Sequence, residues 1–359
     1  MSDAISIKEA VRLVLWGSEK PLRRSEVQQQ VEALLGHTVS SSSITSSLRL
    51  QSQSDRSPVV NIERGIYAYD LDFHPFGKSR LYHGDSLEIL PQLPANSIHA
   101  VVTDPPYGLV EYEGKELSKL RGGRGGVWRI PPSYDGCQRS PLPRFTTLTD
   151  TELRQMARFF EQLGRELMRV LVPGANVLVA SNPLVCHVVT TAMVSAGFEA
   201  RGQVIRLVQT MRGGDRPKGS EDEFNEVSAM ARSQWEPWVM LRKPLDGTTA
   251  NNLRTWKTGG WRRISDERPF GDVIKSSPTR PEERRIAPHP SLKPQRFMRE
   301  VVRASLPLGE GIVLDPFAGS GSTLAAAESL GYRAVGIERD DDYFNLACEA
   351  MPQLRDLEV

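Results

Sequence analysis

Residues 311–323 read Gly-Ile-Val-Leu-Asp-Pro-Phe-Ala-Gly-Ser-Gly-Ser-Thr, and this stretch decides the fold class. A short apolar run enters a glycine-rich turn, and good helix formers follow in residues 324–330. Gly319 and Gly321 let the backbone approach a ligand closely, and the helix that opens at Ser322 and Thr323 presents unpaired N–H groups. The pattern predicts the strand, turn and helix start of a nucleotide-type site, although such turns also occur in α/β sheets that bind no cofactor.

A second apolar run, residues 334–337, ends in Glu338, about twenty residues after the first glycine. An acidic side chain at that distance is placed to bind ribose hydroxyls. The nicotinamide fingerprint shares this spacing, but its third glycine is missing because Leu324 stands at that position. The turn therefore favours a nucleotide-like cofactor other than a nicotinamide.

The second informative stretch is Asp104-Pro105-Pro106-Tyr107, directly after the apolar run 98–102. The amino nitrogen of adenine or cytosine is a weak nucleophile because its lone pair is delocalised into the ring. Asp104 could accept one amino hydrogen and the carbonyl of Pro105 the other, with the two prolines stiffening the backbone. Tyr107 would stack on a base that has left its helix. The alternative is a proline turn that merely closes a strand.

Together these stretches resemble the S-adenosylmethionine-dependent amino-group DNA methyltransferases of class β, in which the catalytic half precedes the cofactor half. Residues 104–107 match the family's catalytic motif, and residues 315–321 match its Phe-x-Gly-x-Gly cofactor motif. The segment 289–294, His-Pro-Ser-Leu-Lys-Pro, resembles the family's His-Pro-Thr-Gln-Lys-Pro, with departures at Ser291 and Leu292. The resemblance covers roughly residues 79–351 and implies an α/β fold with a doubly wound, mostly parallel sheet.

The resemblance also implies the roles of individual residues. Residues 81–86 are similar to the family's Gly-Asp motif, which would place Asp85 near the adenine ring of the cofactor, and residues 235–244 resemble a late strand of the methylase sheet. The implied cofactor-binding residues are Asp85, His289, Ser291, Lys293, Asp315, Phe317, Gly319, Gly321, Ser322, Thr323 and Glu338.

Distant motifs can share one site because ligands of doubly wound sheets bind where the parallel strands end. We therefore expect the strands 98–102 and 312–314 to lie close together, with Tyr107 and Phe317 on either side of the transferred methyl group.

The resemblance favours adenine N6 as the target, because family members that act on cytosine N4 more often carry serine at position 104. Cytosine N4 is the alternative. Methylation of a ring carbon is disfavoured because it typically needs a cysteine directly after a proline, and Cys137, Cys186 and Cys348 all follow other residues. RNA or protein glutamine as substrate would predict asparagine at position 104. A DNA-binding regulator that has lost catalysis is a further alternative.

The formal net charge is only +1, but its distribution is uneven. Between Arg242 and Arg303 there are 15 Lys or Arg residues against 7 Asp or Glu residues. We interpret residues 245–288 as the target-recognition region, in which basic side chains would bind phosphates or guanine edges; a solvated insert is the alternative. The candidate DNA-binding residues are Arg254, Lys257, Arg262 and Arg263. Residues 111–147 are expected to form a flexible loop near the active site.

The first 70 residues have a different pattern. Helical spacing of apolar residues at 7–16, 24–35 and 41–50, followed by strands at 59–62 and 65–69, predicts a winged helix-turn-helix domain that is similar to HARE-HTH modules. Its third helix would dock on DNA, or the domain would serve protein contacts. Residues 71–78 are then a linker, and residues 79–359 are the methyltransferase domain.

Compositional signals limit the remaining possibilities. The three cysteines form no Cys-x-x-Cys pair, and neither an apolar leader nor a membrane span is evident. We expect a cytoplasmic protein, prokaryotic or from a phage in its host, without a metal site. The expected partner is double-stranded DNA; a cognate restriction endonuclease and a second copy of the chain are further candidates that the sequence does not decide.

Overall fold

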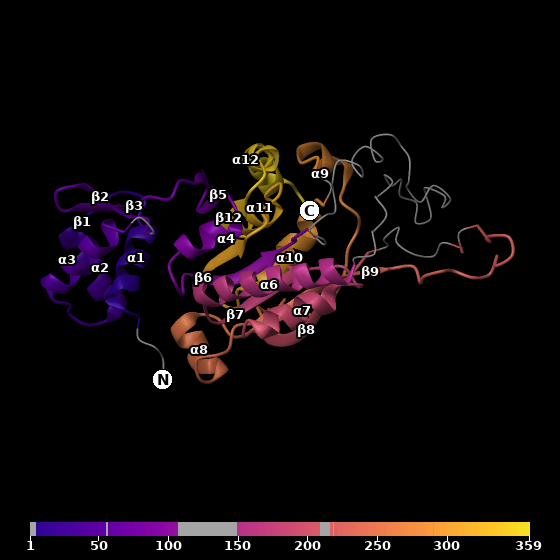
Figure 1. Cartoon of the computed structure of the whole chain (residues 1–359), viewed down its shortest axis with the longest axis horizontal. Helices are drawn as coiled ribbons and strands as arrows, with labels where there is room; N and C mark the ends of the chain where they lie inside the picture. Colours follow the sequence, from indigo (N-terminus) through magenta and orange to yellow (C-terminus); the bar gives the residue numbers. More distant parts are fainter. Residues whose placement is uncertain (1–4, 55–56, 107–148, 209–215, 218, 290) are drawn as a thin grey trace.

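The computed structural model describes residues 5–54, 57–106, 149–208, 216–217, 219–289 and 291–359 (Figure 1). A small N-terminal domain of helices and short strands stands beside a larger α/β domain (Figure 1). The flexible loop predicted at 111–147 lies outside the described residues, as do Tyr107 and Pro290.

One nine-stranded sheet forms the centre of the larger domain, with the strand order β10-β8-β9-β7-β6-β11-β12-β5-β4. Strands β9 and β4 are antiparallel to their neighbours, and the other strands share one direction. The strands are β4 (His74–Phe76), β5 (Ser79–His83), β6 (Ile98–Thr103), β7 (Leu171–Ala180), β8 (Glu199–Leu207), β9 (Trp235–Arg242), β10 (Val273–Lys275), β11 (Ile312–Asp315) and β12 (Arg333–Glu338). The α/β fold class with a mostly parallel sheet is thus confirmed.

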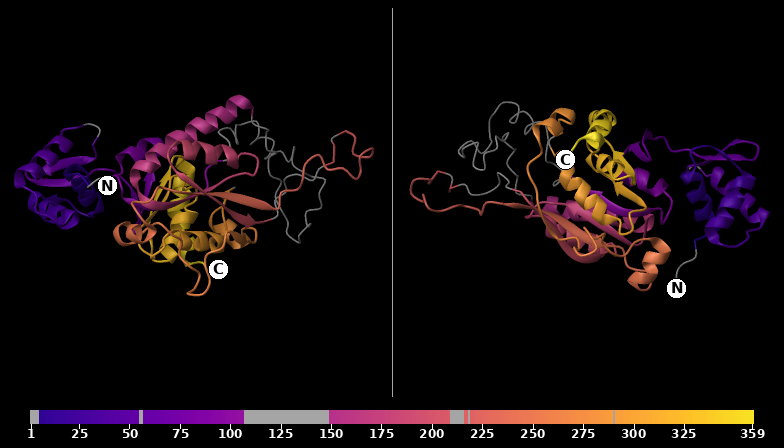
Figure 2. Two further views of the ribbon diagram at one scale, coloured as in Figure 1. Left: turned by 90° about the horizontal axis from the view of Figure 1, so that it is seen from below. Right: turned by 180° about the vertical axis from the view of Figure 1, so that it is seen from behind.

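Helices cover both faces of this sheet (Figure 2). Side chains of α6 (Asp150–Val170) and α7 (Cys186–Ser195) pack on one face. Those of α10 (Gln295–Ser305), α11 (Ser322–Ser329) and α12 (Asp341–Asp356) pack on the other. The short elements are α4 (Ser86–Ile89), η1 (Leu90–Gln92), α8 (Thr249–Trp256) and α9 (Pro281–Ile286). This double cover explains why the central strands are continuous apolar runs: both faces of each strand are buried.

The expected neighbourhood of the two motif strands is confirmed. β6 pairs in parallel with β11, with Ala100 opposite Val313 and Val101 opposite Leu314. The two strands therefore end together on the same side of the sheet. We call this side, where the carboxyl ends of the strands that share one direction lie, the carboxyl edge, and the opposite side the amino edge. Chain connections change direction between β6 and β11, which is where ligands of open α/β sheets bind.

The N-terminal domain contains α1 (Ile7–Gly17), α2 (Arg24–Leu35) and α3 (Ser41–Ser52), close to the predicted bounds. Its strands β1 (Leu22–Arg23), β2 (Val59–Glu63) and β3 (Ile66–Tyr69) form an antiparallel sheet in the order β1-β3-β2. A separate apolar core holds the domain together. The winged-helix assignment and DNA contact through α3 stay predictions.

The segment 71–78, expected to be a linker, contains β4, which pairs with β5 along the edge of the large sheet. The two domains also pack against each other. The indole of Trp16 is buried in the core of the larger domain, and its Nε1 donates a hydrogen bond to the Tyr82 hydroxyl at 3.0 Å. The carbonyl of Trp16 accepts from Arg80 Nη1 at 2.6 Å. The junction is therefore a packed interface in addition to a covalent connection.

Two negative findings concern the described residues alone. None of their helices has the length and apolar character that a membrane crossing requires. Within the same residues, no three His, Cys, Asp or Glu side chains gather in a way that could hold a metal ion.

Candidate functional site

The carboxyl ends of β6 and β11 are joined by a buried carboxylate. Thr103 Oγ1 donates to Asp315 Oδ1 at 2.6 Å, and Thr323 Oγ1 donates to Asp315 Oδ2 at 2.6 Å. The backbone N–H of Phe317 donates to Asp315 Oδ1 at 3.1 Å. Burial raises the pKa of Asp315 to about 6, against the opposing effect of the two hydroxyls. Asp315 and Thr323, both implied cofactor residues, thus hold the turn together from inside.

The glycine turn that follows has a backbone that only glycine adopts readily. Gly319 and Gly321 have φ values of 52° and 79°, in the left-handed region. A Cβ at Gly321 would lie 2.3 Å from Met351 Cγ, and one at Gly319 would lie 3.3 Å from the His289 ring. Helix α11 begins directly afterwards at Ser322, whose carbonyl accepts from Gln295 Nε2 at 3.0 Å. The positive φ values explain the two glycines at this turn, and close approach of a ligand to its backbone stays a prediction.

Two acidic residues stand at neighbouring strand ends beside this turn. Glu338 ends β12, and its carboxylate accepts from the N–H groups of Gly319 at 2.7 Å and Asp340 at 2.8 Å. Asp85 follows β5, caps α4 through the N–H of Leu87 at 2.9 Å, and lies 3.3 Å from Arg339 Nη1. Both carboxylates are therefore fixed at the carboxyl edge, next to the glycine turn.

The segment around His289 lies over the same turn. The His289 ring makes an edge contact with Tyr343, with 4.4 Å between centroids. Its Nδ1 accepts from the N–H of Ser291 at 3.2 Å. Burial, and next the charge of Lys293, lower the pKa of His289 to about 4, so the ring is neutral near pH 7. His289 and Ser291 thus lie near the glycine turn, and their role in cofactor binding stays a prediction.

Phe317 lies in the turn after β11. It packs against Phe159 of α6, with 6.0 Å between ring centroids. Pro105 is buried and Pro106 is exposed at the end of β6. Tyr107, expected opposite Phe317, lies outside the described residues, so the paired-aromatic arrangement stays a prediction.

Asp104 lies beside Lys293, whose Nζ is 2.5 Å from Asp104 Oδ2. Lys293 Nζ is also 3.3 Å from Glu236 Oε1 of β9. Burial alone would lower the pKa of Lys293, but the charges of Asp104 and Glu236 outweigh it and raise the pKa above its usual value. Lys293 was expected at the cofactor, and the structure places its ammonium beside the carboxylate of Asp104, the predicted catalytic residue. No short motif marks Glu236 as a partner, so sequence reasoning missed it.

The four predicted DNA-binding residues come from the other edge of the sheet. β9 is antiparallel to β7, with Ala180 opposite Trp238 near the carboxyl edge and Asn176 opposite Arg242 near the amino edge. The chain thus leaves β9 at the amino edge, where α8 packs against β7 and Asn252 Nδ2 donates to Pro173 O at 2.9 Å (Figure 1).

The contacts of the remaining candidates agree with this placement. Arg262 N donates to Ala304 O at 3.0 Å, and its guanidinium donates to the Tyr332 hydroxyl just before β12 begins. The carbonyl of Arg263 accepts from Arg303 Nη1 at 2.9 Å. Arg254, Lys257, Arg262 and Arg263 therefore do not line the edge that holds Asp104, and their role in DNA binding stays a prediction, as does the interpretation of 245–288 as the target-recognition region. This segment contains α8, β10 and α9, with Asn252 and Thr258 fully buried.

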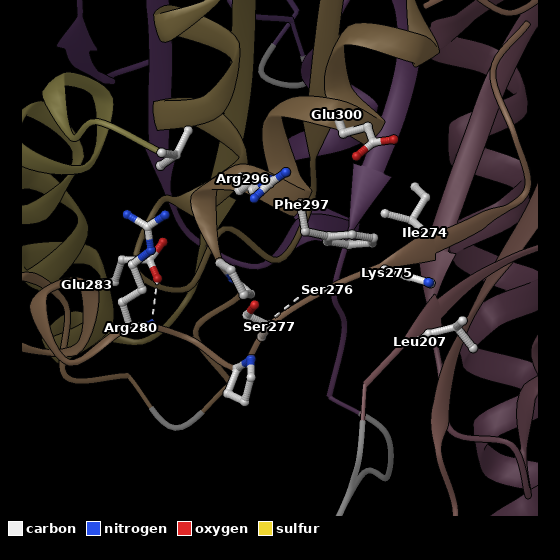
Figure 3. A pocket seen from close by; sticks show the side chains of 13 residues that line it. Leu207, Ile274, Lys275, Ser276, Ser277, Arg280, Glu283, Arg296, Phe297 and Glu300 are labelled. Atoms are coloured by element: carbon white, nitrogen blue, oxygen red, sulfur yellow. Dashed lines mark hydrogen bonds between the residues drawn. The ribbon is translucent and has the colours of Figure 1, made fainter. Parts of the chain in front are cut away.

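A cavity of about 340 Å³ lies between the ends of β8 and β10 and the start of α10 (Figure 3). Arg206 stacks on the ring of Phe297, one of its lining residues, at 5.1 Å from the centroid. The lining residues are Leu207, Ile274, Lys275, Ser276, Ser277, Pro278, Arg280, Glu283, Pro294, Arg296, Phe297, Glu300 and Val359. None of the residues predicted as catalytic or cofactor-binding lines this cavity.

Comparison with known proteins agrees with this architecture. The N6_N4_Mtase family model, described as DNA methylase, matches residues 98–349. The type II methyltransferase M.HindIII of Haemophilus influenzae is 27% identical over 294 residues, which is 74% of this chain and 93% of that protein. M2.DpnII of Streptococcus pneumoniae is 23% identical, over 75% of this chain and 88% of that protein.

Among solved structures, the cytosine-N4-specific PvuII DNA methyltransferase has the same fold, with a TM-score of 0.51 at 15% identity, covering 80% of this chain and 91% of that one. The family match extends from β6, the strand before Asp104, into α12, the helix after Glu338. The chain therefore belongs to the N6/N4 amino-methylase family and is a DNA methyltransferase that uses S-adenosylmethionine.

Proposed function

We propose that this protein methylates the exocyclic N6 of adenine in double-stranded DNA. The observation that carries the proposal is the ion pair of a carboxylate at the end of β6: Asp104 Oδ2 lies 2.5 Å from Lys293 Nζ, and β6 pairs with β11, the strand that enters the glycine turn. A charged carboxylate is a strong hydrogen-bond acceptor for an amino group.

The proposed chemistry follows from the weakness of the target nitrogen. Asp104 and the carbonyl of Pro105 accept the two amino hydrogens and bring the nitrogen lone pair out of conjugation with the ring. Bound S-adenosylmethionine supplies a methyl group on a positively charged sulfur. As the N–C bond forms, the C–S bond breaks and its electron pair stays on sulfur, and the nitrogen then releases one proton to water. Alignment of the two reactants contributes much of the rate enhancement.

Asp104 is the residue that favours adenine over cytosine. The cytosine-N4 enzymes that the chain resembles more often carry serine at this position, which is a tendency within the family. Cytosine N4 therefore remains the second candidate, since its amino group needs the same two acceptors.

Arg254, Lys257, Arg262 and Arg263 would contact DNA phosphates away from the target base, because these residues lie at the amino edge. The type II names of two relatives support a role beside a cognate restriction endonuclease. Resistance of DNA from expressing cells to a panel of type II endonucleases tests this role.

The experiment that tests the target is expression in bacteria without DNA methylation, followed by base-modification sequencing. The expected result is N6-methyladenine at one short sequence, absent with the Asp104→Ala variant. Methylated cytosine at N4 would move the assignment to the second candidate. DNA without any modification, from soluble protein that binds the cofactor, would contradict the proposal and favour a non-catalytic regulator.

A further inference from the structure

Four charged side chains from four separate segments form one continuous chain below the catalytic turn. Arg206 Nη1 of β8 lies 2.9 Å from Glu236 Oε2 of β9. Glu236 Oε1 lies 3.3 Å from Lys293 Nζ, which in turn lies 2.5 Å from Asp104 Oδ2. Charges alternate along the chain, and the side chains are only 7%, 14%, 8% and 15% exposed in the order Arg206, Glu236, Lys293, Asp104. The ion pairs thus connect the sheet to the catalytic carboxylate.

The far end of this charge chain is held firmly. Arg206 Nε donates to Ser276 Oγ at 3.0 Å, and its Nη2 donates to Ser277 O at 3.3 Å. Trp238 Nε1 donates to Glu236 Oε2 at 3.3 Å. Phe297 packs against Trp238, with 5.2 Å between ring centroids, and also carries Arg206 on its face. Glu236 and Arg206 therefore have little freedom, as expected of members of a connected polar network.

Stability alone gives little reason for such an arrangement. Removing charges from water costs several kcal/mol per ion, and a well-packed apolar replacement of a buried ion pair is often neutral or stabilising. The charge chain ends at Asp104, which in the proposed reaction accepts a hydrogen from the target amino group. A fixed, preorganised charge or hydrogen-bond partner beside a reacting group is a general means of catalysis.

We propose that Glu236 and Arg206 are positioning residues for methyl transfer: they hold the Lys293 ammonium on Asp104, which fixes the orientation of that carboxylate and keeps it ionised. The proposal rests on the proposed transfer at Asp104. Loss of Glu236 or Arg206 is therefore expected to lower kcat and to leave the affinities for cofactor and DNA nearly unchanged.

The two variants should change the pH dependence in opposite ways. In Glu236→Gln, Lys293 loses the carboxylate charge of Glu236, so its buried ammonium should lose its proton at a lower pH and the basic limb of the kcat profile should move to lower pH. In Arg206→Gln, the carboxylates lose a cation, so the acidic limb should move up. Among the described residues, His289 and Asp315 are two further titratable groups that interact with this network, through Lys293 and Asp104 respectively; their pKa values are about 4 and about 6, and both variants retain them.

The experiment measures kcat, KM for DNA and cofactor affinity across pH for the wild type, Glu236→Gln and Arg206→Gln. We expect kcat to fall roughly 10- to 100-fold, since small misplacements of a reacting group have effects of that size. KM for DNA and cofactor affinity should stay within about twofold of the wild-type values, because the variants keep the contacts that bind ground state and transition state equally. Glu236→Asp keeps the charge on a shorter side chain and should recover part of kcat.

Glu199→Gln is the matched control. Glu199 Oε2 pairs with Arg242 Nη2 at 2.6 Å and links the same two strands, β8 and β9, at the amino edge. Its kcat should equal that of the wild type. The positioning role is overturned if Glu236→Gln keeps the wild-type kcat and the wild-type pH profile of kcat. It is also overturned if the control Glu199→Gln loses as much activity as Glu236→Gln. If Glu236→Gln does not fold, full activity and an unchanged profile of Glu236→Asp and Arg206→Lys would overturn it as well. An inactive wild type would contradict the proposed function instead.

Discussion

Thr103 Oγ1 lies 2.6 Å from Asp315 Oδ1, so the last residue of β6 and the last residue of β11 share a hydrogen bond. The same carboxylate accepts from Thr323 at the start of α11. The two motifs are 212 residues apart in sequence, yet one buried side chain sets their distance. Because the strands are also paired through their backbones, the relative position of the two motifs is built into the sheet.

The buried carboxyl of Asp315 should leave a signature in the pH dependence of stability. Its folded-state pKa of about 6 lies above the ordinary value of 3.8. The protonated form is therefore favoured by folding, and this contribution is present below pH 3.8 and lost as pH rises through about 6. At 1.36 kcal/mol per pKa unit, the loss amounts to about 3 kcal/mol.

The Asp315→Asn variant should lack this loss. The new amide can donate to Thr323 Oγ1, whose hydrogen is then available to Val102 O at 3.4 Å. Urea unfolding at intervals from pH 4 to pH 7 measures the difference in unfolding free energy between variant and wild type. That difference should grow in favour of asparagine as pH rises. A difference that stays constant from pH 4 to pH 7 would contradict the raised pKa of Asp315.

Asp104→Asn should remove methyl transfer while cofactor binding persists. The amide has no negative charge to accept an amino hydrogen strongly, and Lys293 keeps Glu236 as a partner. We expect kcat to fall by at least about 10²-fold, the size measured for loss of one preorganised hydrogen-bond partner of a reacting group. Methyl transfer to DNA and calorimetric titration with S-adenosylmethionine measure the two effects separately. A loss of cofactor affinity comparable to the loss of kcat would contradict the assignment of Asp104 to catalysis and of the residues after β11 to cofactor binding.

The sequence predicted the centre of this fold better than its edges. The motif strands were recognisable because they are buried on both faces and therefore read as apolar runs, such as residues 98–103. Residues 71–78 lack such a run because β4 is a short edge strand. The place of the basic region after β9 could not be predicted, because a count of charges along the chain does not reveal that β9 is antiparallel. Nor could spacing reveal the contact between Lys293 and Asp104, which depends on tertiary packing.

Glu338 offers a test of the ribose assignment. Its carboxylate is oriented by the N–H groups of Gly319 and Asp340, and hydrogen bonds to a charged acceptor are each worth about 1.5–3 kcal/mol. Glu338→Ala should weaken cofactor affinity roughly 10- to 100-fold, with kcat at saturating cofactor changed little. Calorimetry with S-adenosylmethionine and with its 2′-deoxy analogue separates ribose contact from loosening of the turn. The wild type should discriminate between the two ligands and the variant should not; equal discrimination in both proteins would refute the assignment.

Gly321 and Gly331 form a natural pair of positions for measuring the close contact under the cofactor turn. Both have positive φ, 79° and 73°, so alanine strains the backbone at either position. At Gly321 the new Cβ would also lie 2.3 Å from Met351 Cγ, whereas at Gly331 nothing lies within 4 Å. Gly321→Ala should therefore be less stable than Gly331→Ala by about 1–3 kcal/mol, the usual cost of overpacking. Thermal unfolding of both variants provides the comparison, and equal losses would mean that Met351 moves aside without cost.

Trp16 should couple the unfolding of the two domains. Its indole is buried among side chains of the larger domain, and its Nε1 bonds to the Tyr82 hydroxyl. Trp16→Ala should cost about 3–5 kcal/mol, in the range of buried aromatic truncations. Trp16→Phe keeps most of the apolar contact and loses the hydrogen bond, so it should cost only about 1 kcal/mol.

Hydrogen exchange of the amides in α2 and α3 measures the coupling directly. In the wild type, these amides should exchange through the same opening as those of β5, because a packed interface makes the two regions cooperative. In Trp16→Ala they should exchange faster while the amides of β6 and β11 keep their protection, and Trp16→Phe should resemble the wild type. Unchanged protection of α2 and α3 in Trp16→Ala would mean that the N-terminal domain is stable by itself, through its own apolar core, and that the interface only orients it.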